Sequence, residues 1–426
     1  SFQAVRSSKK KVMDIFEHKF NEMKSSESIG TLATKCISDS LCCLALPFKQ
    51  DPDLRADYIN HRGDIKVGAL LEDMDAFAGY CAYAHCAKGI SVFPTIVTAS
   101  MDKMDLHGSL DADQDLQLVG AVTHVGYSSM NVDIDVATLE SCPQSVMSAS
   151  FTFVARDGEN NSLAVPTITP KNEDEQRLEE RGRQRQAGRK SARVHSLSKQ
   201  PPSVEELEVL HQIFTDHNNA PPSNTKHIKH QHDRNTAYNS DSDEVMSLAM
   251  KDTRMGTTVV CHPQMRNVHN KVFGGYLMRK AYELAWANAN VVTRGPVYFL
   301  ELDDIFFQAP VEVGSLVEFQ ARSTYGFNSS GSAIPSTLSV SVRADVMDPV
   351  TWKRQRTNTF EFVFSCDPPT ASVKGRLAPE IWPVTYEEGM AYLMSRRRHN
   401  YTNGSADDVQ SRKLVFGADN YLSALK

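Results

Sequence analysis

The stretch from Asn267 to Gly275 reads NVHNKVFGG, and an earlier stretch from Asn60 to Gly68 reads NHRGDIKVG. Each begins with Asn, carries a β-branched residue at its sixth position and ends with Gly, and the two lie 207 residues apart. Two more pairs of segments match in the same order, at offsets of 200 and 209 residues: Leu116–Ser129 with Leu316–Ser329, and Phe151–Val154 with Phe360–Val363. Three matched blocks in one order predict a tandem duplication of one structural unit.

Both copies share one outline of expected secondary structure. The loop that holds the Asn and the Gly leads into one helix, over residues 69–86 in the first copy and 276–290 in the second. Alternating apolar and polar residues then predict strands, with clear runs at residues 131–136 and 338–343. One helix followed by a series of antiparallel strands indicates the α+β class, with the helix packed on a curved sheet.

Length and composition limit the classes of protein that this chain can represent. A chain of 426 residues exceeds the size of one hydrophobic core, so we expect two or three domains. A net charge of −6 gives no electrostatic reason to expect specific nucleic-acid binding. No apolar run reaches the roughly 18 to 20 residues that a transmembrane helix needs, so no transmembrane segment is expected. The eight cysteines include no CxxC pair, which favours free, buried thiols in a reducing compartment.

Shifts in composition divide the chain into five predicted parts. Residues 171–193 are almost wholly charged or polar, which predicts a solvent-exposed connecting helix, although their basic end is also compatible with RNA or membrane binding. Residues 215–243 are rich in Asn, Pro, His, Ser and Asp, which predicts a mobile insertion. The five parts are an N-terminal helical extension (1–44), a first domain (45–165), a linker (166–244), a second domain (245–395) and a C-terminal tail (396–426).

The first predicted helix carries a carboxylate on its apolar face. Asp75 lies four residues after Leu71 and three before Ala78, so it belongs to the same stripe as these apolar residues. Burial of a bare charge is expensive, and a carboxylate there must be hydrogen-bonded or paired. Two readings are open, a catalytic carboxylate and a structural one that holds a loop. The neighbouring Glu72 and Asp73 point elsewhere on the helix and are expected to be solvated.

The loop ahead of each helix supplies a complementary group. Gly68 in the first copy, and Gly274 with Gly275 in the second, allow the backbone to come close to a ligand. They also leave unpaired N–H groups at the positive end of a helix, where a carbonyl oxygen or an oxyanion could bind. The spacing of fifteen residues between Asn60 and Asp75, with this helix start between them, makes the pattern more specific.

The stretch from Asn267 to Ala289, NVHNKVFGGYLMRKAYELAWANA, resembles the signature of hotdog-fold acyl-CoA thioesterases. It is especially similar to the mitochondrial double-hotdog group typified by acyl-CoA thioesterase nine. The resemblance covers roughly residues 45–160 and 245–395, and other stretches that carry it are DIKVGALLEDMD (64–75), KDTR (251–254), CHPQM (261–265), DDIFFQ (303–308) and PVEVGS (310–315). It implies tandem hotdog folds, each a long helix wrapped by a curved antiparallel sheet, that face each other as an intrachain pseudo-dimer.

The resemblance also implies hydrolysis of acyl-CoA to a free acid and coenzyme A at a site composed of both halves. Carried over by position, one site joins Asn267 and the Gly275 N–H to Asp75. The mirror site joins Asn60 and Gly68 to the second helix, but seven residues after Gly275 stands Tyr282, and the carboxylate Glu283 follows one step later. One step on a helix is a turn of about 100°, and Arg279 and Lys280 offer Glu283 an ordinary ion pair instead. The site at Asp75 is therefore the favoured one.

The expected mechanism uses water and no cofactor. Asp75 acts as a general base on water or attacks the thioester to form an anhydride, the Gly275 N–H polarises the thioester carbonyl, and Asn267 orients the water or the oxygen. Coenzyme A belongs to the substrate, and no metal site is expected. Gly68, Gly274, Lys271 and Arg266 are candidates for substrate binding, the last two for the phosphates. The absence of a Gly-x-Ser-x-Gly motif argues against an α/β-hydrolase.

Two other functions are rivals to this one. A hotdog protein with reduced catalysis could serve as a structural subunit of a larger assembly, although the retained Asn267 and Asp75 argue against it. A hotdog dehydratase would need a histidine near the helix Asp, but no such pair stands at the expected spacing, and His61, the nearest histidine, is a poor candidate. The resemblance implies a mitochondrial matrix protein that forms a homo-oligomer of pseudo-dimers. The basic segment after Ser1 is either the mature edge left by a removed targeting peptide or a solvated leading helix.

Overall fold

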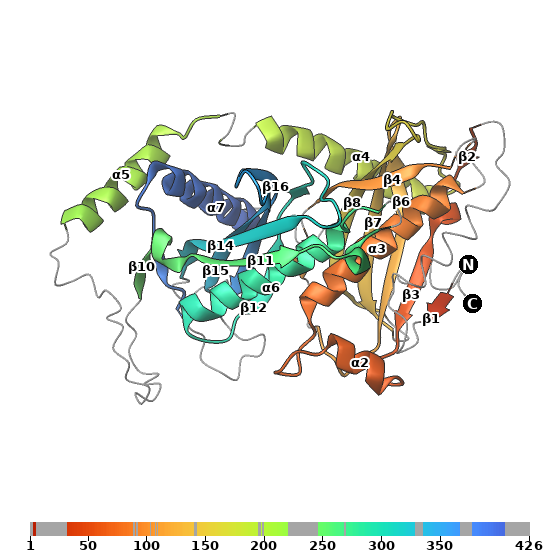
Figure 1. The fold of residues 1–426 in the computed structure, drawn as a ribbon. Coiled ribbons are helices and arrows are strands. Elements are labelled where there is room, and N and C mark those ends of the chain that lie inside the picture. Colours follow the sequence, from red (N-terminus) through yellow and green to blue (C-terminus); the bar gives the residue numbers. More distant parts are fainter. Residues whose placement is uncertain are drawn as a thin grey trace.

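The computed structural model describes residues 3–5, 32–87, 90, 93–102, 104–106, 108, 110–139, 143–194, 197, 200–219, 246–267, 270–328, 335–366 and 377–404. It consists of two halves of the α+β class that lie side by side, each with one long helix against a sheet (Figure 1). These helices are α3 (Val67–Cys86) and α6 (Gly274–Thr293), and they contact each other between the halves. Both predicted helices are confirmed, and both extend past the expected bounds.

Apart from α2 in the first half, the two halves have the same order of main elements. The first half contains α2 (Pro52–Tyr58), α3 and the strands β3 (Cys42–Leu46), β4 (Thr95–Met101), β5 (Met104–Leu106), β6 (Leu116–Val125), β7 (Ser129–Thr138) and β8 (Ser145–Arg156). The second contains α6 and the strands β11 (Met255–Val260), β12 (Tyr298–Leu302), β13 (Ile305–Phe306), β14 (Leu316–Phe327), β15 (Thr337–Met347) and β16 (Arg354–Ser365). Shorter elements are β1 (Gln3–Val5), β2 (Thr34–Lys35), β9 (Thr167–Ile168), β10 (Ser247–Ala249), β17 (Glu380–Trp382) and the 3₁₀ turns Ile37–Ser40, Met250–Thr253 and Pro263–Met265.

The strands of both halves form one continuous sheet. Its main path runs β1-β3-β6-β7-β8-β5-β12-β16-β15-β14-β11, while β4 pairs with β8 and β13. The order β3-β6-β7-β8 in one half repeats as β11-β14-β15-β16 in the other, which confirms the predicted duplication. The halves are joined where β5 pairs with β12 and where β4 pairs with β13, all antiparallel.

Each long helix buries its apolar stripe against the inner face of that part of the sheet which belongs to its own half. In α3 the predicted stripe of Leu71, Met74, Ala78 and Ala82 is fully buried. The equivalent stripe in α6 is buried as well, and both belong to one hydrophobic core that includes the phenylalanines of β8 and β16. Sheet residues alternate between this core and the outer face because successive side chains of a strand point in opposite directions.

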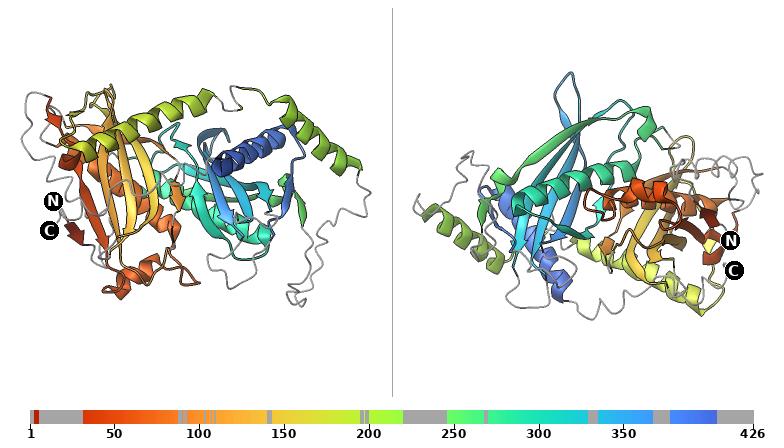
Figure 2. Two further views of the ribbon diagram at one scale, coloured as in Figure 1. Left: turned by 180° about the vertical axis from the view of Figure 1, so that it is seen from behind. Right: turned by 90° about the horizontal axis from the view of Figure 1, so that it is seen from below.

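The outer faces of both sheets are partly covered by further helices (Figure 2). Helix α4 (Glu173–Val194) confirms the predicted connecting helix, but it is not wholly exposed: Leu178 is buried with Val119 and Ala121 of β6. Helix α7 (Tyr386–Gly404) covers the second sheet, where the Ser395 and Thr324 hydroxyls lie 2.8 Å apart. Helix α5 (Val204–Asn219) is tied to α7 by an ion pair between Glu206 and Arg397.

Two predicted boundaries are wrong. The described residues of the supposed helical extension form strands and a 3₁₀ turn, and β3 crosses the expected boundary at residues 44 and 45 as a strand of the first sheet. Helix α7 crosses the expected boundary at residues 395 and 396, so the second domain continues through it. The start of the predicted mobile insertion, residues 215–219, is helical, and the remainder lies outside the described residues. The basic segment near the N-terminus also lies outside them.

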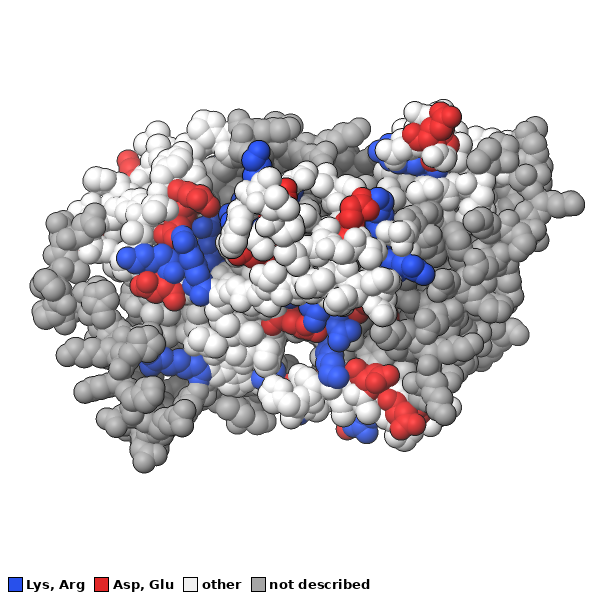
Figure 3. Space-filling model, in the orientation of Figure 1, with Lys and Arg blue, Asp and Glu red and all other residues white. Residues whose placement is uncertain are grey.

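The described cysteines agree with the expectation of buried thiols. Seven of the cysteines, all but Cys142, lie among the described residues, and each is buried. Where the chain is described, no helix combines the length and the apolar character needed to span a membrane. Acidic and basic side chains alternate in small mixed groups on the face shown in Figure 3, with no broad basic area among the coloured residues.

Candidate active site

Asp75 lies at the centre of the contact between the two halves. It sits in the third turn of α3 and is completely buried. Its Oδ2 atom accepts a hydrogen bond of 2.6 Å from the backbone N–H of Gly275, and its Oδ1 accepts one of 3.2 Å from the Thr98 hydroxyl. The predicted pairing of the first helix carboxylate with the second loop is therefore present, because the N-terminus of α6 points at α3.

The environment of Asp75 changes its acidity. Burial raises the pKa of this carboxyl from 3.8 to about 7, since water no longer solvates the charged form. The Gly275 N–H and the Thr98 hydroxyl lower the pKa because they hydrogen-bond to the carboxylate, and the nearby Glu72 charge raises it. A carboxyl with a pKa near 7 is suited to accept a proton at neutral pH.

Sequence reasoning missed Thr98, a residue of β4. Its role is visible only from the sheet, because Thr98 is 23 residues from Asp75 along the chain. Thr98 pairs with Phe153 immediately before a bulge in β4, and in the second half Phe299 pairs with Phe364 immediately before the matching bulge in β12. Phe299 thus replaces Thr98 in the second half, where its ring contacts Tyr282 as the Thr98 hydroxyl contacts Asp75, so no hydroxyl is offered there.

The two asparagines shape their loops in the same way. The Oδ1 atom of Asn267 accepts the Lys271 N–H at 3.1 Å, and the Oδ1 atom of Asn60 accepts the N–H groups of Arg62 and Asp64 at 2.8 and 3.1 Å. These hydrogen bonds from the backbone to the side chain fix the loop that delivers the chain into each helix. The amide oxygen of each asparagine accepts hydrogen bonds from its own loop, and the NH₂ group is the donor that the side chain could offer to a carbonyl or a water.

Gly275 is required by the packing of the helices. A Cβ atom on Gly275 would lie 2.9 Å from both the Cα and the carbonyl oxygen of Glu72, and 2.7 Å from a ring carbon of Phe273. A Cβ on Gly274 would meet Asp75 Oδ2 at 3.0 Å and the Phe307 ring at 3.2 Å. The glycines therefore permit close approach of α6 to α3. The Gly275 N–H that we expected at the thioester carbonyl donates to Asp75 in this structure.

The mirror site differs from the one at Asp75. Tyr282 faces Gly68, where an added Cβ would lie 3.1 Å from Tyr282 Cδ1, and its ring packs on Phe299, Phe362 and Phe364. Glu283 is half-exposed and accepts hydrogen bonds from Arg279 at 2.9 Å and Lys280 at 2.7 Å, and these two cations lower its pKa despite partial burial. The alternative of an ordinary ion pair is thus what the structure contains, and Glu283 is not brought to Asn60 and Gly68.

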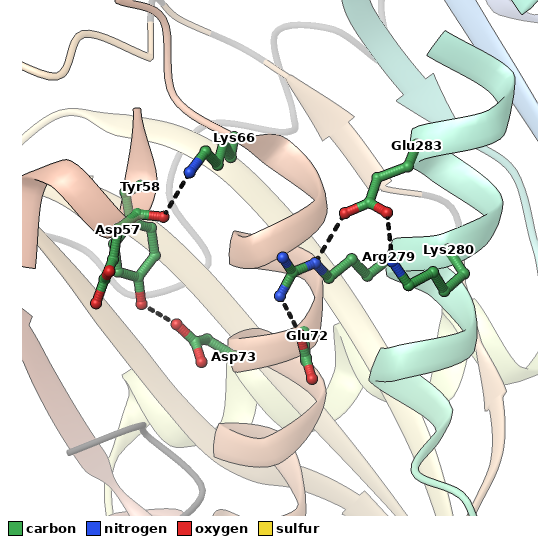
Figure 4. Close-up of polar contacts among 8 residues, drawn as sticks. All are labelled: Asp57, Tyr58, Lys66, Glu72, Asp73, Arg279, Lys280 and Glu283. Atoms are coloured by element: carbon green, nitrogen blue, oxygen red, sulfur yellow. Dashed lines mark hydrogen bonds and ion pairs between the residues drawn. The ribbon is translucent and has the colours of Figure 1, made fainter. Parts of the chain in front are cut away.

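The neighbours of Asp75 on α3 are not simply solvated, contrary to our expectation (Figure 4). Glu72 pairs across the helix contact with Arg279 of α6, at 2.9 Å. Asp73 is buried and accepts a hydrogen bond from the Tyr58 hydroxyl of α2. Both carboxylates therefore fix elements that surround the site.

The candidate phosphate-binding residues lie on the loop ahead of α6. Lys271 is partly exposed and pairs with Glu312, and Arg266 is exposed. The larger described cavity, about 520 Å³, lies elsewhere, on the outer face of the second sheet beside Arg254, Arg322, Arg343 and Arg356.

Two histidines of the first half, His85 and His61, make their described contacts with residues other than Asp75. His85 is buried against the Pro166 carbonyl at 2.9 Å, and burial lowers its pKa to about 4, in keeping with a structural role. His61 packs edge-on against Trp286.

Comparison with known proteins gives consistent matches. Residues 62–141 match the family model described as thioesterase superfamily. Acyl-coenzyme A thioesterase 9, mitochondrial, of Mus musculus is 32% identical over 377 residues, which span 87% of this chain and 80% of that protein. The Homo sapiens protein of the same name is 31% identical over 388 residues, 89% of this chain and 82% of that protein. Acyl-coenzyme A thioesterase 4, mitochondrial, of Humulus lupulus is 33% identical over 395 residues, covering 89% and 70%.

Proposed function

Because the chain belongs to the acyl-coenzyme A thioesterase family that includes the mitochondrial thioesterases 9, we propose that it hydrolyses acyl-CoA at one composite site centred on Asp75. The family membership makes the chain a thioester hydrolase. The observation that carries the choice of site is the hydrogen bond of 2.6 Å that the Gly275 N–H of one half donates to the Asp75 carboxylate of the other. Asn267, on the loop that leads into α6, completes the site.

The chemistry begins with exchange of one hydrogen bond. The thioester carbonyl oxygen takes the Gly275 N–H, which stabilises the oxyanion as negative charge develops there. Asp75 then loses a hydrogen bond to its charged form, so its basicity rises at the moment when a proton must be accepted. As a general base, Asp75 removes a proton from water that attacks the carbonyl carbon, and the coenzyme A thiolate leaves. Attack by Asp75 itself, with an anhydride intermediate that water hydrolyses, uses the same groups.

Several finer assignments accompany this proposal. The NH₂ group of Asn267 orients the water or the carbonyl oxygen, and Lys271 and Arg266 bind the phosphates of coenzyme A. The reaction needs no metal or organic cofactor. The mirror position, with Tyr282 and Phe299 in place of Asp75 and Thr98, has no catalytic activity. The chain resides in mitochondria like the relatives named above and forms a homo-oligomer of pseudo-dimers.

Release of free thiol from acyl-CoAs of short to long chain length tests the function and the site together. We expect wild type to release coenzyme A and Asp75→Ala to lower kcat by about 10²–10⁴-fold, the usual contribution of a general base. Glu283→Ala should retain kcat, because Glu283 faces two cations and not the site. Folded wild type that releases no thiol from any acyl-CoA would instead favour the structural-subunit function. Loss of activity in Glu283→Ala alone would move the site to the mirror position.

A further inference from the structure

The contact between α3 and α6 has an approximate twofold axis. The matched blocks place Gly68, Glu72 and Asp75 at positions equivalent to Gly275, Arg279 and Tyr282, at the offset of 207 residues. Asp75 contacts Gly275, and Tyr282 faces Gly68, so these two contacts are related by the axis. Between them, Glu72 contacts Arg279, its own equivalent. A residue that meets its own equivalent lies on the axis.

The backbone repeats this symmetry at the same point. A Cβ on Gly275 would lie 2.9 Å from the carbonyl oxygen of Glu72, and a Cβ on Gly68 would lie 3.6 Å from the carbonyl oxygen of Arg279. The helices therefore cross where each glycine packs over the axial residue of the other half. The side chains of Glu72 and Arg279 are 25% and 38% exposed, so their ion pair of 2.9 Å is screened less than one on the open surface (Figure 4).

We propose that the Glu72–Arg279 pair makes the two halves select each other and sets the position of α6 on α3, so that Gly275 meets Asp75. The partner recognised by each half is the opposite half of the chain, in preference to a second copy of itself. Around the same axis, two first halves would place Glu72 against Glu72, and two second halves would place Arg279 against Arg279. Like charges that face each other across an interface are strongly unfavourable, whereas the mixed pair is attractive.

This selection matters for the reaction, and that part of the inference rests on the proposed function. Asp75 is present only in the first half, and the loop that carries Asn267 and Gly275 only in the second. A pair of second halves would have Tyr282 at both positions and no carboxylate. Glu72 and Arg279 are thus positioning residues, which act through the first turns of α6 on the Gly275 N–H and do not touch the thioester themselves.

A charge-swap cycle in the full chain tests the proposal. Glu72→Arg and Arg279→Glu each place two like charges on the axis, whereas the double variant restores an opposite pair in reversed order. We expect each single variant to lower kcat by about tenfold or more, with KM changed by less than about threefold, and to melt about 2 °C or more below wild type. The double variant should recover kcat to within about fivefold of wild type and most of the melting temperature, since the carboxylate introduced by Arg279→Glu repels Glu283 along α6 only weakly.

A matched pair away from the axis provides the control. Glu318 and Arg354 form a cross-strand ion pair on the outer face of the second sheet, with 19% and 41% exposed side chains. Reversal of either should leave kcat within about twofold. Equal losses of kcat at this pair and at the axis would overturn the special role of Glu72 and Arg279. The same conclusion would follow if the loss in the double axial variant equalled the sum of the losses in the two single variants.

Two further measurements keep the outcome decisive. If a reversed variant does not fold, the cycle is repeated with Glu72→Gln and Arg279→Gln, where coupling supports the proposal and additivity refutes it. The melting temperatures test the pairing even if wild type proves inactive. A coupled thermal cycle without any thiol release would therefore retain the pairing and discard the proposed reaction.

Discussion

Substitution of the two equivalent glycines by alanine should have opposite effects. In Gly275→Ala the new Cβ meets two backbone atoms of Glu72 at 2.9 Å, which no side-chain rotation can relieve. Because carbon contacts are favourable at about 3.5–4.0 Å, α6 must move away from α3 by at least about half an ångström. In Gly68→Ala the nearest atoms are Tyr282 Cδ1 at 3.1 Å and Arg279 Cγ at 3.3 Å, and both belong to side chains that can shift.

The energies follow from this geometry. Overpacking against a rigid neighbour costs about 1–3 kcal/mol, and a better helix propensity returns up to about 1 kcal/mol in either variant. We expect Gly275→Ala to be destabilised by about 1–2 kcal/mol and Gly68→Ala to be neutral or slightly stabilised. The displacement also moves the Gly275 N–H from the carboxylate and the thioester, so kcat should fall about 10²–10³-fold, as for loss of one oxyanion donor.

Urea unfolding and thiol release measure these two effects on the same preparations. Gly68→Ala controls for the general cost of a methyl group near a helix start. A Gly275→Ala protein with wild-type stability and kcat would refute the close-approach argument. Equal damage in Gly68→Ala would show that the two sites are functionally equivalent, contrary to the proposed asymmetry.

Further predictions concern Asp75 and the buried thiols. The pKa of Asp75 in the folded state, about 7, exceeds its unfolded value, so the free energy of unfolding falls as pH rises from about 4 to 7 and stays lower above pH 7. Asp75→Asn should remove this loss and therefore stabilise the fold by up to about 4 kcal/mol at pH 8 but not at pH 4. Urea unfolding at both pH values measures the difference. In the free enzyme, kcat/KM should fall about tenfold per unit below pH 7 and level off above it, and a flat profile would contradict Asp75 as the base. Thr98→Val removes a hydrogen bond that favours the charged carboxylate, so the acid limb should move to higher pH; an unchanged limb would exclude this role. The seven described cysteines should react with an alkylating reagent only after unfolding, and rapid labelling of these positions in the native protein, seen by peptide mapping, would contradict their burial.

Much of the fold could be predicted because each sequence pattern that indicates a loop, a helix or a strand occurs twice in the duplicated chain. The Asn–Gly loops, the helix that follows each of them and the strands after it occur in both copies, so each prediction was supported by the other. Asp75 could be assigned to the buried face from the spacing of Leu71 and Ala78 alone. The boundaries were less predictable, since β3 is a short apolar strand ahead of the repeat and α7 is a helix of mixed polar and apolar residues. The sheet contacts that place both elements are remote in sequence.

The details of the site were predictable only in part. The pairing of Asp75 with Gly275 followed from the resemblance, but the hydroxyl of Thr98 did not, because a strand register determines which residue of β4 meets the helix. Glu72 and Asp73 were expected in solvent because a helical wheel describes one helix against one sheet. It does not contain the second helix, which supplies Arg279, or α2, which supplies Tyr58.

The main-chain bonds that link β5 to β12 and β4 to β13 have a consequence for the way in which the protein unfolds. Neither half can open on its own without exposing unpaired amides at the junction, so there is no hinge between them along the sheet. The protein should melt cooperatively as one unit, although its chain is long enough for two. Amide protons at the junction should then exchange with solvent as slowly as those deep within either half, since both await the same global event.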